Sequence, residues 1–101
     1  MRVVYAERAR SDVGDIYDYL ARKSPQAARR VEDMIRSTCE GLADFPYAAV
    51  ATDEPNVRRL PLVRYPYTIF YRVDAGRALV EIARVIYSGR VQDLGKLPAG
   101  N

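Results

Sequence analysis

The chain has 101 residues, of which 49% are hydrophobic and 29% charged, and it has a formal net charge of +3. This length predicts one domain with a modest core, and no apolar run approaches the roughly 18 residues of a membrane span. Because it has no histidine and only one cysteine, Cys39, the sequence excludes Ser-His-Asp and Cys-His catalysis, imidazole- or thiolate-based zinc sites and an internal disulfide. With no apolar stretch long enough for a signal peptide, we expect a cytoplasmic protein. We also expect no cofactor.

The first half of the chain predicts a short strand followed by two helices. Residues 2–6 combine β-branched and aromatic side chains, which favours a strand. The next apolar residues recur at helical spacing and form one stripe, Ala9, Val13, Ile16, Tyr17 and Leu20. Ser24 and Pro25 then suit the N-cap and first position of a second helix. Its stripe consists of Ala28, Val31, Ile35, Cys39 and Leu42. The short connection predicts an antiparallel helix hairpin.

The second half predicts a loop over residues 44–56 and three strands over 57–62, 66–73 and 78–87. Alternation directs four side chains of the middle strand toward the helices, Tyr67, Ile69, Tyr71 and Val73. We expect them to form the core with Val80, Ile82 and Ile86. This order predicts an α+β domain over residues 1–93: an N-terminal strand, an antiparallel two-helix hairpin and a three-stranded antiparallel meander, with the helices packed on one face of the sheet. Residues 94–101 are expected to form a flexible tail.

Positive charge is concentrated in the C-terminal half. Through residue 56 the chain has eight Lys and Arg against ten Asp and Glu, or −2, whereas from residue 57 it has eight against three, or +5. Nearly all of these cations are arginines, whose planar fork suits phosphate or carboxylate. A GC-rich genome explains an arginine-rich composition equally well.

Several segments together resemble the RelE/ParE superfamily of small bacterial toxins from type II toxin–antitoxin modules. They are the helix hairpin DVGDIYDYLARKSPQAARRVEDMI, the following LADFP, and the strand segments RRLPLVRYPYTIFYRV and VEIARVIYSGRVQD. The likeness extends over about residues 2–93. It implies one of two activities: RelE-like members cleave messenger RNA in the ribosomal A site, whereas ParE-like members poison DNA gyrase. It also implies a cognate antitoxin that wraps the toxin, often one with a ribbon-helix-helix DNA-binding part.

The resemblance also identifies candidate site residues. If the protein were a RelE-like ribonuclease, the matching positions would be Arg59, Arg64, Arg72, Arg84, Tyr87 and Arg90. Tyr87 stands where many relatives have a histidine, and a tyrosine is a poor base at neutral pH. The absent histidine and the modest net charge favour ParE-like gyrase inhibition through protein–protein contact. The alternatives are a RelE-like ribosome-dependent mRNA endonuclease and a binding module without toxicity.

These side chains also have structural interpretations. Arg72 is placed to pair with Glu81 across the hairpin, and Arg84 to bind an acid on a helix. A solvated pair of surface arginines explains Arg58 and Arg59 as well as a functional role does. The alternating tyrosines are expected in the core rather than as a base-stacking surface.

The seam between helices and sheet is the expected antitoxin site, because an amphipathic antitoxin helix can dock there by its apolar stripe. We expect its exposed apolar residues to include some of Val13, Tyr17, Leu20 and Leu42. The arginines near the C-terminus are expected to point outward.

Overall fold

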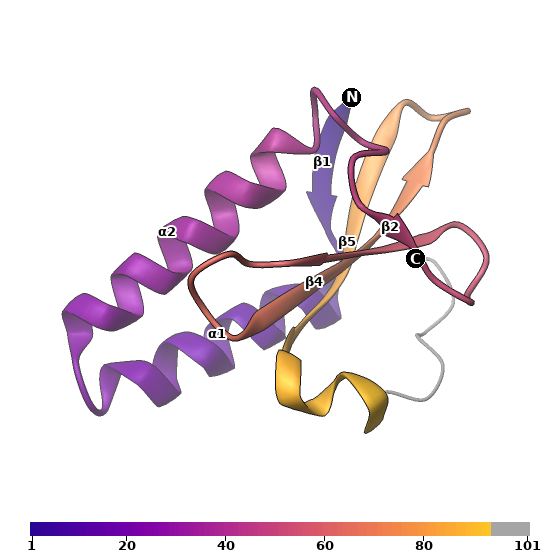
Figure 1. Cartoon of the computed structure of the whole chain (residues 1–101). Helices are drawn as coiled ribbons and strands as arrows, with labels where there is room; N and C mark the ends of the chain where they lie inside the picture. The colour runs from indigo at the N-terminus through magenta and orange to yellow at the C-terminus, as the bar shows by residue number, and fades with distance from the viewer. Residues whose placement is uncertain (94–101) are drawn as a thin grey trace.

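Two helices cover one face of a five-stranded sheet in the computed structural model, which describes residues 1–93 (Figure 1). The expected tail, residues 94–101, lies outside the described residues. The elements in chain order are β1 (Arg2–Tyr5), α1 (Glu7–Ala21), α2 (Pro25–Gly41), β2 (Val50–Ala51), β3 (Val57–Pro61), β4 (Tyr67–Asp74), β5 (Leu79–Tyr87) and the 3-10 helix η1 (Ser88–Asp93). This arrangement confirms the α+β prediction.

The helix hairpin forms where the sequence predicts it. The Ser24 hydroxyl accepts a hydrogen bond from the Ala27 N–H at 3.2 Å, and Pro25 occupies the first position of α2. This cap satisfies one of the free N–H groups at the helix start. The apolar stripe of α2 is fully buried, with Ile35 and Cys39 at 0% exposure. Burial of such a stripe against the sheet supplies most of the stability of a helix of this length.

The strand order is β1-β5-β4-β3-β2. The N-terminal strand β1 joins β5 in parallel, whereas every other neighbouring pair is antiparallel. The short strand β2 was not predicted, since it lies within the expected 44–56 loop. Its two residues pair with Arg58 and Arg59 of β3. All three strands of the meander, β3, β4 and β5, therefore lie between the edge strands β1 and β2, which come from earlier in the chain.

A β-bulge changes which side chains of β5 face the helices. Phe70 pairs with Arg84 but Tyr71 pairs with Ile82, so Ala83 is an extra residue on β5. An extra residue shifts the alternation by one position. Val80 and Ile82 face the helices as predicted, but beyond the bulge Val85 takes that side.

The prediction that Ile86 packs against the helices is therefore wrong. Ile86 belongs to a second buried cluster, made of Val57, Phe70, Ala83 and Ile86. For β4 the alternation is confirmed, because Tyr67, Ile69 and Tyr71 are in the helix-side core and Val73 packs against it. Among the described residues, no helix is long and apolar enough to cross a bilayer.

Candidate functional site

A cleft of about 620 Å³ opens between α1 and the end of β5, and we call it the α1–β5 cleft. It is lined by Arg8, Asp12, Asp15, Ile16 and Tyr19 of α1, Tyr67 of β4, Arg84, Val85, Ile86 and Tyr87 of β5, and Arg90 of η1. Three of the six candidate ribonuclease residues, Arg84, Tyr87 and Arg90, thus share one site. Charged groups of both signs and three tyrosines meet there, so the cleft can bind a polar partner.

Asp12 holds Arg84 at the inner wall of this cleft. Arg84 donates from Nε to Asp12 Oδ2 at 2.8 Å and from Nη2 to Oδ1 at 3.2 Å. The Val85 backbone N–H donates to the same Oδ2 at 2.9 Å. The Arg84 and Asp12 side chains are only 15% and 11% exposed. The interpretation of Arg84 as an arginine bound to a helix acid is confirmed, and the expectation that it points outward is wrong.

The reason for this contact lies in the edge of β5. Pairing between β1 and β5 ends at Tyr5 and Ile82, after which the chain turns into α1. Beyond Ile82, β5 has no strand partner on that side, and its free N–H at Val85 needs an acceptor. Asp12 supplies that acceptor from α1. The carboxylate therefore substitutes for a strand and neutralises Arg84 at once.

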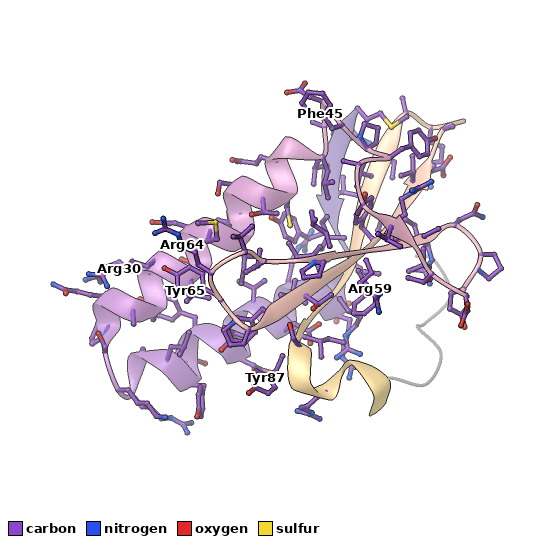
Figure 2. The ribbon with its side chains drawn as sticks, in the orientation of Figure 1. Arg30, Phe45, Arg59, Arg64, Tyr65 and Tyr87 are labelled. Atoms are coloured by element: carbon purple, nitrogen blue, oxygen red, sulfur yellow. The ribbon has the colours of Figure 1, made fainter. Side chains whose placement is uncertain are left out.

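Tyr87 lines the cleft at the end of β5, beside η1 (Figure 2). The Tyr87 side chain is half exposed, and its ring meets the Tyr67 ring edge-on, with centroids 6.1 Å apart and planes at 73°. Gly89 permits this position, because a Cβ there would lie 2.6 Å from Tyr87 Cε2. Burial raises the pKa of Tyr67, and negative charge on Tyr19 or Tyr87 would raise it further. Tyr67 therefore stays protonated at neutral pH.

The start of η1 is held against β4. The Thr68 and Ser88 hydroxyl oxygens are 2.8 Å apart, and the Ser88 N–H donates to the Pro66 carbonyl at 2.7 Å. Arg90 follows within η1 and is exposed. Unlike Arg84, it agrees with the expectation of an outward arginine.

The other three candidate residues lie outside the cleft lining. Arg72 approaches Glu81 across the hairpin at 3.7 Å, as the structural interpretation predicts. It lines a second cleft of about 500 Å³ at the other end of β4 and β5. Arg64 is exposed in the β3–β4 loop, apart from Tyr87 (Figure 2). Arg59 is exposed on β3, opposite Phe70.

Arg58 differs from its neighbour Arg59. Its guanidinium donates to the Ala49 carbonyl at 2.7 Å and the Tyr47 carbonyl at 3.4 Å, and it lies over the Tyr47 ring at 5.0 Å. The prediction of a solvated Arg58–Arg59 pair is therefore wrong for Arg58. Its side chain holds the loop between α2 and β2 instead.

The expected antitoxin seam is only partly exposed. Val13 and Leu42 are 6% and 2% exposed and belong to the core between helices and sheet. The expectation of exposed apolar surface is therefore wrong for these two residues. Tyr17 and Leu20 of α1 are partly buried and keep some exposed surface. A contact between antitoxin and this seam stays a prediction for Tyr17 and Leu20.

Sequence reasoning missed Asp12, although a signal was present. The apolar pattern places Asp12 off the inward face of α1, but Asp12 follows Ala9 by three positions and precedes Ile16 by four, so it lies at the edge of the apolar stripe. An acid that is partly buried at such an edge needs a partner. Within residues 1–93, no three His, Cys, Asp or Glu side chains gather where they could hold a metal ion.

Comparison with known proteins identifies relatives along nearly the whole chain. Residues 3–92 match the family model described as the ParE toxin of the type II toxin–antitoxin system parDE. The chain is 36% identical over 93 residues to toxin RelE2 of Caulobacter vibrioides, covering 89% of this chain and 98% of that protein.

Solved structures agree with this result. A chain from the chromosomal ParDE toxin–antitoxin system of P. aeruginosa superposes with a TM-score of 0.74 at 26% identity, covering 86% of this chain and 95% of that one. The isolated E. coli RelE toxin shares the fold, with a TM-score of 0.60 at 18% identity over 92% of this chain and 97% of that one.

Proposed function

The chain belongs to the ParE toxin family within the RelE/ParE superfamily of type II toxin–antitoxin systems, and we propose that it arrests growth by binding DNA gyrase rather than by cutting RNA. The family model has the ParE name and the curated relative the RelE name. The two names point to different targets, and the chemistry of the α1–β5 cleft favours gyrase.

The bidentate contact between Arg84 and Asp12 supports this choice. Cleavage of RNA by its 2′-hydroxyl needs a base for that hydroxyl, positive charge at the phosphate and an acid for the leaving oxygen. Arg84 is bound at 2.8 Å and 3.2 Å by a carboxylate, so it contributes little net charge to a phosphate. Asp15 adds a second carboxylate to the cleft. The sequence also has no imidazole, which leaves the cleft without the usual base for neutral pH.

A supercoiling assay with purified gyrase tests this proposal. Antitoxin-free toxin should inhibit supercoiling and trap the cleavage complex, and the toxin–antitoxin complex should do neither. The half-exposed Tyr87 and the exposed Arg90 are the first residues to substitute by alanine, with the exposed Arg77, which lines the second cleft, as the matched arginine control. Normal supercoiling and no trapped complex with toxin in excess would exclude gyrase as the target.

We also propose a cognate antitoxin of the ribbon-helix-helix type as the partner in a hetero-oligomeric complex. The structural relative from P. aeruginosa is itself part of a ParDE toxin–antitoxin system. Tyr17 and Leu20 are the partly exposed apolar residues of the seam. Tyr17→Ala should weaken capture of the toxin by co-expressed antitoxin, whereas the exposed Arg29→Ala on α2 should not. Equal capture of both variants would show that the antitoxin does not bind at Tyr17.

Two observations favour the alternative, a RelE-like ribosome-dependent mRNA endonuclease. Arg84, Tyr87 and Arg90 do meet in one cleft, and the curated relative is named RelE2. This activity predicts cleaved transcripts in a translating extract and their loss with Tyr87→Phe. Intact transcripts with the wild-type toxin would end this alternative. Harmless expression without antitoxin would instead indicate a binding module without toxicity.

A further inference from the structure

We propose that Asp12 is a specificity-determining residue, because its carboxylate occupies the position where the α1–β5 cleft would otherwise bind a phosphate group of RNA. The proposal deepens the proposed function and rests on it in one respect, namely that the wild-type cleft does not use RNA. It explains how a chain with the RelE/ParE fold keeps three of its candidate ribonuclease residues together while Arg84 is not available to a phosphate.

The donors around Asp12 form a complete anion site. Arg84 Nε, Arg84 Nη2 and the Val85 N–H converge on one carboxylate at 2.8, 3.2 and 2.9 Å. A guanidinium fork combined with a backbone N–H binds phosphate oxygens as well as carboxylate oxygens. The site is therefore built for an oxyanion, and the oxyanion is part of the chain itself.

The same donors should stay in place when the carboxylate is removed. Val85 is 2% exposed and pairs with Ile69 of β4, so its backbone is fixed by the sheet. Its N–H faces the edge of β5 that β1 leaves open after Ile82. The cleft in front of it has a volume of about 620 Å³, within the range of pockets that bind small ligands. A phosphate with its ribose can therefore reach these donors.

The charge of the cleft supports the same conclusion and supplies a control. Its lining has three cations, Arg8, Arg84 and Arg90, and two anions, Asp12 and Asp15, which gives +1. Asn in place of either aspartate raises this to +2. Asp15 is exposed, whereas Asp12 holds Arg84. Asp15→Asn thus changes the charge of the same cleft by the same amount without releasing Arg84.

The test measures binding of a fluorescein-labelled single-stranded oligoribonucleotide to antitoxin-free toxin by anisotropy at about 0.15 M salt, where exposed charges are screened. Asp12→Asn should tighten binding about tenfold or more over wild type, since it frees a charged donor. Asp15→Asn should change it less than about threefold, because an exposed charge is screened. Adding Arg84→Gln to Asp12→Asn should abolish the gain. Equal gains for the two asparagine variants, or no gain for Asp12→Asn, would overturn the proposal.

Phosphate binding and thermal stability are measured for the same variants. Titration with inorganic phosphate, followed by amide NMR, should shift the Val85 signal in Asp12→Ser, whose shorter side chain leaves the position of the carboxylate open, and leave it unchanged in wild type. A shift with phosphate but no gain with RNA would overturn RNA as the excluded ligand. Thermal unfolding checks each variant first, and Asp12→Ser is the second variant if Asp12→Asn does not fold. The binding assay contains no gyrase, so loss of gyrase inhibition would refute the proposed function while leaving this result intact.

Discussion

Removal of the Asp12 carboxylate should destabilise the fold as well as change the cleft. Asp12→Ala deletes three hydrogen bonds, leaves Arg84 without its partner and leaves the Val85 N–H without an acceptor. Breaking a buried ion pair costs about 3–5 kcal/mol, and an orphaned donor about 1–3 kcal/mol. Because the two side chains keep 15% and 11% exposure, water from the cleft can replace part of the contact. We therefore expect a loss of about 3 kcal/mol in the free energy of unfolding.

Urea unfolding followed by circular dichroism measures this loss directly, and it corresponds to a fall in Tm of about 10–25 °C for a domain of this size. Asp12→Asn keeps an acceptor for Val85 and should lose about half as much. Asp15→Ala, on the same helix but exposed, should lose less than about 0.5 kcal/mol. A double-mutant cycle of Asp12→Ala with Arg84→Met should give a coupling of about 1–2 kcal/mol. Equal stability of Asp12→Ala and Asp15→Ala would refute the assignment of Asp12 as the support of the β5 edge.

Three further predictions concern single positions. Ala78 has a φ of 53°, which glycine adopts without strain. Ala78→Gly should therefore raise the free energy of unfolding by about 0.5–1 kcal/mol, measured as a higher urea midpoint, and an unchanged or lower midpoint would contradict this. Burial raises the pKa of the Cys39 thiol from 9.0 to about 11. Between these two pKa values the native state binds more protons than the unfolded state. The contribution of the thiol to the free energy of unfolding is therefore fully present below about pH 9 and is lost as the pH rises. Cys39→Ala should make this fall less steep in urea titrations at pH 8–11. The Tyr71 hydroxyl donates to the Pro46 carbonyl at 2.8 Å, so Tyr71→Phe should cost about 1–2 kcal/mol, and a loss below about 0.3 kcal/mol would show that water replaces the bond.

The resemblance supplied all six candidate residues, and three of them lie in the α1–β5 cleft. Arg84, Tyr87 and Arg90 meet there because they follow closely along one strand and its continuation. Arg59, Arg64 and Arg72 were grouped with them by resemblance alone, and the fold separates them from the cleft. Asp12 is 72 positions from Arg84 in the chain, so no local pattern could pair them.

The sequence by itself determined the elements whose signal is local. Apolar spacing specified both helical faces, and Ser24 with Pro25 specified where α2 begins. Alternation specified the inner face of β4, because side chains two positions apart on a strand point to the same face of the sheet. The absence of histidine excluded Ser-His-Asp and Cys-His catalysis without any structure.

Only the tertiary structure decided the features that depend on distant parts of the chain meeting. The parallel docking of β1 beside β5 leaves the edge of β5 open at Val85, and α1 then delivers Asp12 to that edge. The bulge at Ala83 moves Val85 into the core and Ile86 to the opposite face. Strand register and ion pairing are set by contacts between segments far apart in sequence, whereas periodicity reports only on neighbours along the chain.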